Sequence, residues 1–182
     1  MGKRIIAQAR GRGGPTYRSP SFRYAGQVQY PQAAESTYHI ADIMHCQGHS
    51  APLAVLRNPE GSIFYNVAAE GMSVGQEISV GSSDDASRGN VMALRKIPEG
   101  TSVYNIERVP GDGGKFVRSS GSFAKVVTQS EEGVVVQLPS KKTKLFHPEC
   151  RATIGTIAGS GRTDKPMLNT LCELVYNFFF EN

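Results

Sequence analysis

The sequence has no tryptophan and only three cysteines among its 182 residues. Cys46, Cys150 and Cys172 lie far apart, so their spacing gives no disulfide framework and favours reduced thiols in a cytosolic protein. Without tryptophan, only tyrosine and phenylalanine are left to stack on a nucleobase. The chain shows no apolar signal-peptide core, and no run approaches the roughly 20 apolar residues of a membrane span. We therefore expect neither a secreted disulfide-rich protein nor a membrane protein.

Acidic and basic residues are unevenly distributed along the chain, and some segments lack one sign of charge altogether. The small net charge of +4 hides this asymmetry. Residues 1–24 carry six Lys or Arg and no acid, whereas residues 25–86 carry one Arg against seven acids. Residues 87–165 carry thirteen basic and seven acidic residues, and residues 166–182 carry two acids and no base. This segregation indicates basic surfaces placed to meet a polyanion.

Residues 1–24 mix these cations with Gly, Pro, Ser and Thr, and such a segment cannot bury enough apolar surface to fold alone. It is either an arm that becomes ordered along phosphates or a solvated disordered tail, and the one-sided charge favours the arm. Three aromatic residues interleave with the cations, which permits stacking beside charge. The candidate RNA-binding residues of the arm are Lys3, Arg4, Arg10, Arg12, Arg18 and Arg23.

Short β segments follow, and no helix-length window keeps apolar residues at helical spacing. An all-β fold is therefore predicted, with small barrels built from short strands between Gly and Pro turns. A boundary is expected near residues 81–90, where Ser, Asp and Gly accumulate. The first strand, Tyr38–Met44, is interrupted at Asp42. The strands are expected at 38–44, 51–56, 62–67, 77–80, 91–94, 102–109, 123–128, 134–138, 144–146 and 153–157, with hairpin turns at 131–133 and 139–142.

One sequence pattern occurs twice. A Pro-Glu-Gly turn at residues 59–61 precedes Tyr65-Asn66-Val67, and another at residues 98–100 precedes Tyr104-Asn105-Ile106. An old duplication and a recurrent type of turn both account for it, and the recurrent turn is favoured.

Two glycine-rich blocks, residues 110–115 and 150–166, are the most informative motifs. Each places glycines beside Lys or Arg, so the backbone can approach a polyanionic ligand while a cation faces it. Ordinary surface cations are the alternative interpretation for about half of the residues concerned. Lys141, Lys142 and Lys144 are instead expected to form a solvated hairpin edge. The RNA-binding candidates in this half are Lys115, Arg118, Arg151, Arg162 and Lys165.

Catalytic and metal sites are less well supported. The sequence Gly111–Phe116 has the wrong spacing for a phosphate-binding loop and lacks the hydroxyl that would hold magnesium. No serine has the context of a nucleophile elbow. A zinc site would need the cluster His45-Cys46-His49 to meet His147 and Cys150 across two barrels, with no Cys-x-x-Cys pair. We expect no enzymatic activity, no cofactor, no metal and no small-molecule substrate.

The ordered blocks of this sequence resemble the large-subunit ribosomal protein L-two family, in its archaeal and eukaryotic-like branch. Residues 1–166 are covered almost end to end by this resemblance. The residues that carry it are Gly2-Lys3-Arg4-Ile5, Arg10-Gly11-Arg12-Gly13, Arg18-Ser19-Pro20, Phe22-Arg23, His45, Ser50-Ala51-Pro52-Leu53, Ala69-Glu70-Gly71, Gly89-Asn90-Val91, Ile97-Pro98-Glu99-Gly100-Thr101 and the two glycine-rich blocks.

The resemblance implies four segments: a basic arm (1–24), an oligonucleotide-binding (OB) type barrel (25–86), an SH3-like barrel (87–166) and an atypical apolar tail (167–182). It implies a structural rRNA-binding protein of the cytoplasmic large ribosomal subunit. The protein would lie near the peptidyl-transfer region, support subunit association and have rRNA and neighbouring ribosomal proteins as partners. A non-ribosomal interaction module and a metal-dependent regulator on the same scaffold remain the alternatives.

The likeness is expected to end at Pro166. Family members continue there with a long extension rich in Gly, His and Arg, whereas residues 167–182 are apolar and contain no Lys or Arg. A frameshift or truncated gene model is favoured over an evolved short tail that packs on a partner. The histidine of that extension has no counterpart here. Cys46-Gln47 also replaces the Asp-Pro usual in relatives, which affects only a local turn.

Overall fold

The computed structural model describes residues 5, 7, 12–17, 20–31, 36–81, 85–130, 132–162 and 164. Within them the fold is all-β, and its ten strands form one sheet in the order β3-β2-β1-β4-β5-β10-β6-β7-β8-β9. Four 3₁₀ turns accompany the sheet: η1 (Pro15–Tyr17), η2 (Ser21–Arg23), η3 (Leu94–Lys96) and η4 (Ser160–Arg162). The strands are β1 (Ser36–Met44), β2 (Leu53–Arg57), β3 (Ile63–Val67), β4 (Glu77–Val80), β5 (Val91–Ala93), β6 (Ser102–Tyr104), β7 (Ala124–Ser130), β8 (Gly133–Gln137), β9 (Thr143–Phe146) and β10 (Arg151–Ile154).

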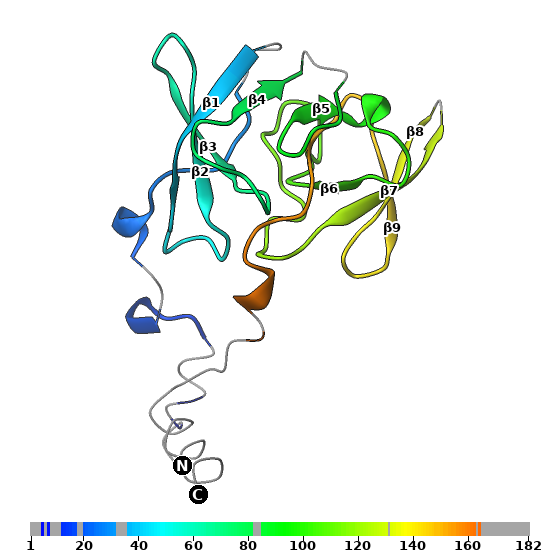
Figure 1. Ribbon diagram of the computed structural model, residues 1–182. Coiled ribbons are helices and arrows are strands. Elements are labelled where there is room, and N and C mark those ends of the chain that lie inside the picture. The colour runs from blue at the N-terminus through cyan, green and yellow to red at the C-terminus, as the bar shows by residue number, and fades with distance from the viewer. Residues whose placement is uncertain are drawn as a thin grey trace, which may run out of the picture.

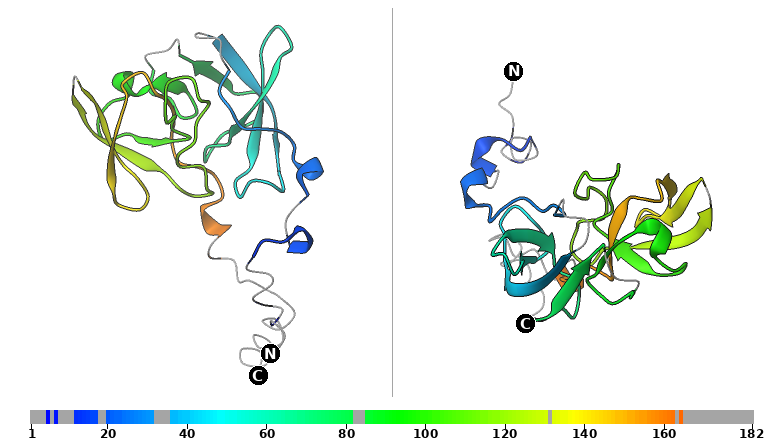
Figure 2. Two further views of the ribbon diagram at one scale, coloured as in Figure 1. Left: turned by 180° about the vertical axis from the view of Figure 1, so that it is seen from behind. Right: turned by 90° about the horizontal axis from the view of Figure 1, so that it is seen from above.

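The strands gather in two lobes that stand side by side (Figures 1 and 2). One lobe contains β1–β4 and the other contains β5–β10. The pairing of β4 with β5 joins the lobes through the single parallel pair Val80↔Val91. The predicted boundary near residues 81–90 corresponds to this connection, and the division into separate domains stays a prediction.

All ten predicted strands are present. β4 has the predicted bounds, seven strands differ from theirs by one or two residues at an end, and two strands differ by three residues or more. The segment expected at 102–109 ends as a strand at Tyr104, because Asn105 has a φ of 49° in the left-handed region and turns the chain. The segment expected at 153–157 begins earlier and ends at Ile154, before Gly155 with its φ of 121°. The predicted interruption at Asp42 is a β-bulge, where the β1–β2 register shifts between Ile40 and Asp42.

Three clusters of buried side chains make up the core. One fills the β1–β4 lobe around Tyr38, Ile40 and Leu56, and one fills the β5–β10 lobe around Val103 and Val126. The third lies between the lobes and combines residues from both, namely Val28, Cys46, Ala51, Leu53, Val67, Ala69, Tyr104 and Ile157. The lobes are therefore held together by a shared apolar layer and not only by strand pairing.

A buried polar network accompanies this shared layer, and the repeated sequence pattern lies within it. Asn66 and Asn105, at equivalent places in the two copies, meet through a hydrogen bond of 3.0 Å from Nδ2 of Asn105 to Oδ1 of Asn66. The hydroxyl of Tyr104 donates to the carbonyl of Val67 at 3.0 Å. Tyr30 adds bonds to the carbonyl of Asn105 (2.7 Å) and the hydroxyl of Thr153 (2.6 Å). The two similar segments thus face each other across the lobe junction.

Residues 20–31 run along the β1–β4 lobe (Figures 1 and 2). Val28 forms an isolated parallel bridge with Tyr65, and Val28 and Tyr30 are both buried. The segment that follows the arm is consequently part of the folded body. Among the residues that the structure describes, no helix has the length and apolar character needed to cross a membrane.

Candidate nucleic-acid interface

Six of the eleven predicted RNA-binding residues fall on the described part of the chain. Four of these six are exposed and two are half-buried: the exposed ones are Arg12, Arg23, Lys115 and Arg162, and the half-buried ones are Arg118 and Arg151. The other five predictions, Lys3, Arg4, Arg10, Arg18 and Lys165, lie outside the described residues.

The arm presents aromatic rings as well as charge. Phe22 in η2 is 83% exposed, and the guanidinium of Arg23 lies 5.8 Å from the centre of its ring. Tyr24 lies against Gly48, where a β-carbon would come within 2.9 Å of the tyrosine ring. The close approach at Gly48 fixes the root of the arm, and Phe22 with Arg23 projects a stacking surface beside a cation.

Lys115 lies at the end of the first glycine-rich block, and its side chain is exposed. Asp112 organises the block, because its carboxylate accepts from the backbone N–H of Arg108 (3.1 Å) and of Gly114 (3.1 Å). The backbone N–H of Lys115 donates to the carbonyl of Ile106 at 2.8 Å. The cation is therefore carried on a loop whose backbone is fixed from both sides.

Two glycines of this block serve a different purpose from the predicted one. Gly113 and Gly114 are buried, and a β-carbon would come within 2.9 Å of Gln29 at the first and within 2.4 Å of Oδ1 of Asn105 at the second. Their lack of a side chain permits close approach to the protein's own backbone and not to an external ligand. Only Gly111 faces open space.

Arg151 is committed to contacts inside the protein. Its Nε and Nη2 donate to Oε1 of Glu107 at 3.1 and 2.8 Å, and its Nη1 donates to the carbonyl of Pro31 at 2.8 Å. Its guanidinium carbon lies 5.3 Å from the ring centre of Tyr30. Glu107 is fully buried and also accepts from the backbone N–H of Gly113. This pair links the second glycine-rich block to the first, and sequence reasoning did not find Glu107, an acid inside an apolar segment.

Arg118 has a similar internal role. Its Nη1 donates to the carbonyl of Gly114 at 3.2 Å, and its Nη2 donates to the carbonyl of Val28 at 3.1 Å. Burial lowers the pKa of Arg118, because the charged form loses its hydration. The guanidinium joins the glycine-rich loop to the segment that follows the arm. Arg118 and Arg151 therefore both hold the loop that carries Lys115.

Arg162 lies in η4, and its Nε donates to the hydroxyl of Ser120 at 2.6 Å. The backbone N–H of Ser120 in turn donates to the hydroxyl of Ser50 at 3.1 Å. Since Ser50 and Gly48 belong to the same loop between β1 and β2, Arg162 and the root of the arm border one loop. Lys115 belongs instead to the first glycine-rich block, which approaches Gln29 at Gly113.

The lysines of the β8–β9 hairpin are exposed, as predicted. Lys141 occupies the turn with a φ of 65°. Lys144 does more than form a solvated edge, because its ammonium lies 4.2 Å from the ring centre of Phe116 and 5.3 Å from that of Phe146.

The sequence candidates for zinc are dispersed. Among the described residues, no group of three or more His, Cys, Asp or Glu side chains is placed to hold a metal ion. Nδ1 of His49 lies 3.2 Å from Sγ of Cys46, which also accepts from the backbone N–H of Ala25. Burial, and then the charge of Arg118, lowers the pKa of His49. The Cys46–His49 contact lies within the β1–β2 loop, and the bond from Ala25 links that loop to the residue that follows the arm.

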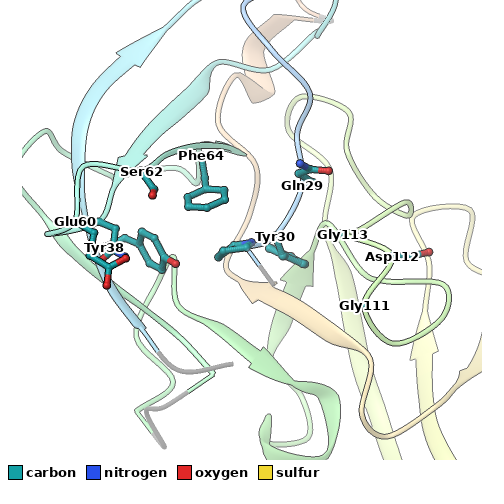
Figure 3. A pocket seen from close by; sticks show the side chains of 11 residues that line it. Gln29, Tyr30, Tyr38, Glu60, Ser62, Phe64, Gly111, Asp112 and Gly113 are labelled. Carbon is teal, nitrogen blue, oxygen red and sulfur yellow. The ribbon is translucent and has the colours of Figure 1, made fainter. Parts of the chain in front are cut away.

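A cavity of about 470 Å³ lies between the first glycine-rich block and the β1–β4 lobe (Figure 3). Its walls include Tyr30, Phe64, Glu60 and the backbone of Gly111–Gly113. Among the described residues, no Lys or Arg lines it. Its chemistry therefore differs from that of the exposed cations, and it is not suited to a phosphate.

Comparisons with known proteins identify what the chain is similar to. A family model described as Ribosomal Proteins L2, C-terminal domain, matches residues 87–174 and thus runs past Pro166. Large ribosomal subunit protein uL2 of Archaeoglobus fulgidus is 47% identical over 170 residues, covering 92% of this chain and 72% of that protein. The uL2 protein of Pyrobaculum neutrophilum is 49% identical over 171 residues (92% and 70%), and that of Picrophilus torridus is 46% identical over 176 residues (97% and 74%).

Proposed function

This chain belongs to the large ribosomal subunit protein uL2 family, and from that membership we propose that it is a structural, rRNA-binding constituent of the cytoplasmic large ribosomal subunit. The observation that carries the proposal is an identity of 47% that extends over 92% of the chain. Its partners are large-subunit rRNA and neighbouring ribosomal proteins. It acts as a scaffold without enzymatic activity, near the peptidyl-transfer region, and it supports subunit association.

The exposed cations supply the binding. Arg12, Arg23, Lys115 and Arg162 contact phosphates in this proposal, together with Lys3, Arg4, Arg10, Arg18 and Lys165. Phosphate contacts dominate the affinity of such proteins and release counterions, so binding weakens as salt is added. The exposed rings of Phe22 and Tyr17 in the arm add stacking, which tolerates different base sequences.

The half-buried arginines act indirectly. Arg118 and Arg151 donate from their guanidinium groups to Gly114, Val28, Glu107 and Pro31. We assign them the role of positioning the glycine-rich loop and the segment that follows the arm, residues 25–31. This changes their predicted role from direct contact with RNA to preorganisation of the loop that carries Lys115.

The proposed domains correspond to the two lobes. Residues 25–86 form the OB-type unit and residues 87–166 the SH3-like unit, with residues 1–24 as the arm and residues 167–182 as an atypical tail. The shared buried layer around Tyr104 and Val67 keeps the two units in one orientation. A fixed orientation allows the cations of the arm, which is anchored on the first unit at Tyr24 and Gly48, and the cations of the second unit to engage one RNA surface without a further ordering cost.

The test is binding to a large-subunit rRNA fragment, measured across a series of salt concentrations. We expect affinity to fall linearly with salt on logarithmic axes, with a slope that reports the number of phosphates contacted. An affinity that is unchanged between low and moderate salt would contradict the proposal. Sedimentation of the tagged chain with large subunits, and not free in the supernatant, is the second expected result.

Deletion of residues 1–24 isolates the contribution of the arm. We expect weaker binding to every RNA sequence tested and a shallower salt slope. The far-ultraviolet circular dichroism of the strands should be retained, because Val28 and Tyr30 remain. Unaltered binding, or loss of the folded state, would contradict the role given to the arm.

A further inference from the structure

A second cavity, also of about 470 Å³, lies on the β5–β10 lobe, and we call it the Phe123 cavity. It has no part in the positioning network of Glu107, Arg118 and Arg151. Its lining comes from the turn before β7, from the start of β7, from the β8–β9 hairpin and from η4. The residues are Ser120, Gly121, Ser122, Phe123, Lys125, Gln137, Leu138, Pro139, Lys141 and Ser160.

The apolar part of the cavity has an aromatic ring that faces solvent. Phe123 is 47% exposed, and Leu138 and Pro139 line the cavity with it. A large ring left half-exposed beside other apolar groups is a suitable surface for a flat apolar face. Since the next residue, Ala124, is buried in the core, the backbone that carries Phe123 is held by the sheet.

The polar part of the cavity is basic. Lys125 and Lys141 are both exposed and both line it, and no Asp or Glu lines it in the part of the chain that the structure describes. Arg162 is bonded through Nε to the hydroxyl of Ser120, which is itself a lining residue. The cavity therefore combines an aromatic surface with cations at its rim, a pairing that complements an aromatic anion.

The backbone at the floor of the cavity is held rigidly by close packing and hydrogen bonds. Gly121 has a φ of 69°, and a β-carbon there would come within 2.5 Å of Cα of Ser160. The backbone N–H of Gly121 donates to the carbonyl of Ile157 at 3.2 Å, and the hydroxyl of Ser122 donates to the carbonyl of Ser119 at 2.5 Å. A preformed surface loses little entropy when a ligand binds.

We propose that the Phe123 cavity binds one unpaired nucleotide of RNA, with its base stacked on Phe123 and its phosphates facing Lys125 and Lys141. The inference rests on the proposed rRNA-binding function and specifies one contact within it. An unpaired base is required, because a base inside a duplex has both faces covered by its neighbours. The site accepts different bases, since stacking uses the face that all bases share. Arg162 lies at the rim and contacts the adjoining phosphate.

The absence of tryptophan from the sequence makes a direct test possible. Phe123→Trp places a single indole in the cavity and keeps an aromatic surface there. Val127→Trp is the matched control, because Val127 is 44% exposed on β7 but does not line the cavity. Each full-length variant is titrated with a short unstructured oligoribonucleotide, with inorganic polyphosphate and with an acidic peptide that contains phenylalanine.

The expected result is saturable quenching of the indole at position 123 by the oligoribonucleotide, little change with polyphosphate and no quenching at position 127. Equal quenching at both positions would overturn the proposal, as would equal responses to RNA and polyphosphate, which indicate an anion site alone. A stronger response to the acidic peptide would overturn it in favour of a protein partner.

Affinity measurements separate this contact from the rest of the interface. Phe123→Ala should weaken oligoribonucleotide binding about 5- to 150-fold, the range found for loss of one stacked base. Phe123→Tyr, which keeps an aromatic ring, should bind with an affinity close to that of the wild type. Phe123→Leu keeps an apolar side chain of similar size but has no ring, and its affinity for the oligoribonucleotide should be as low as that of Phe123→Ala. If Phe123→Ala leaves oligoribonucleotide affinity unchanged while rRNA binding stays salt-dependent, the cavity proposal fails and the proposed function stands. If no RNA binding is found at all, both fail.

Discussion

Glu107 and Arg151 form an ion pair at the lobe junction, with Oε1 of Glu107 accepting from Nη2 of Arg151 at 2.8 Å. The Glu107 side chain is fully buried, and that of Arg151 is 17% exposed. Glu107 Oε2 also accepts from the backbone N–H of Arg151 at 2.8 Å. One carboxylate thus fixes a cation, the start of β10 and the glycine-rich loop at Gly113. The pair fixes the position of the loop, and it directs donors of the Arg151 guanidinium to partners inside the protein.

Removal of one partner of this ion pair should destabilise the folded protein. Glu107→Gln leaves the guanidinium of Arg151 largely buried without a counter-charge, and we expect the free energy of unfolding to fall by about 3 kcal/mol. The measurement is urea denaturation followed by circular dichroism. The double variant Glu107→Leu/Arg151→Met should be closer to the wild type than Glu107→Gln is. A double variant that is less stable than the single one would contradict this view of the pair.

The salt dependence of RNA binding should distinguish exposed from internal cations. Lys115→Gln and Arg162→Gln each remove an exposed charge, and each should lower the magnitude of the salt slope by about one. Glu107→Leu/Arg151→Met should leave the slope unchanged, because the Arg151 donors are already used inside the protein. A slope that falls by one in the double variant would show that Arg151 contacts phosphate.

Two glycines of the same loop provide a matched comparison. Gly111 and Gly114 have φ values of 87° and 90°, so alanine at either position is strained by about 1–2 kcal/mol. Only at Gly114 would the added methyl group meet Asn105, which lies at the buried junction. We expect Gly114→Ala to lower the free energy of unfolding by about 1–3 kcal/mol more than Gly111→Ala does. If thermal or urea denaturation shows that both variants lose the same free energy of unfolding, the Asn105 side chain moves aside for the added methyl group without a measurable cost.

The contribution of the buried Cys150 thiol to the free energy of unfolding should depend on pH in the alkaline range. Burial, and then the negative charge of Glu107, raises its pKa from 9.0 to about 11. A thiol with a raised pKa stabilises the folded state fully below pH 9, and this contribution is lost as the pH rises toward 11, where the unfolded chain gains by ionising. The stability advantage of the wild type over Cys150→Ala should therefore narrow between pH 9 and pH 11. Tyr30 and Tyr104 are present in both proteins and do not affect this difference. A constant difference would contradict the raised pKa.

Much of the fold was predictable because it depends on local pattern. Alternating apolar residues between Gly and Pro turns placed all ten strands. The interruption of the apolar pattern at Asp42 coincides with the bulge in β1, which the sequence did not predict. The end of β6 was not predictable in this way. It depends on Asn105 in the left-handed region, a conformation supported by its contacts with Tyr30 and Asn66 from distant parts of the chain.

The candidate site was predictable in composition but not in detail. Charge counting identified the arm and the cations of the two glycine-rich blocks, since a polyanion ligand requires them whatever the fold. It could not separate Lys115, which is exposed, from Arg151, which is paired with an acid 44 positions away in the chain. Phe123 has no sequence signature either, because its exposure depends on how β7, the β8–β9 hairpin and η4 come together.

The amino-acid sequence by itself determined the all-β class, the family and the excess of positive charge, because all of these are properties of residue order and composition. The tertiary structure alone decided which cations face solvent and which are internal, and it alone showed that Gly113 and Gly114 accommodate Gln29 and Asn105. The physical reason is that a buried charge must find a counter-charge or hydrogen-bond acceptors. Only the three-dimensional path of the chain brings Glu107 and Pro31 to Arg151.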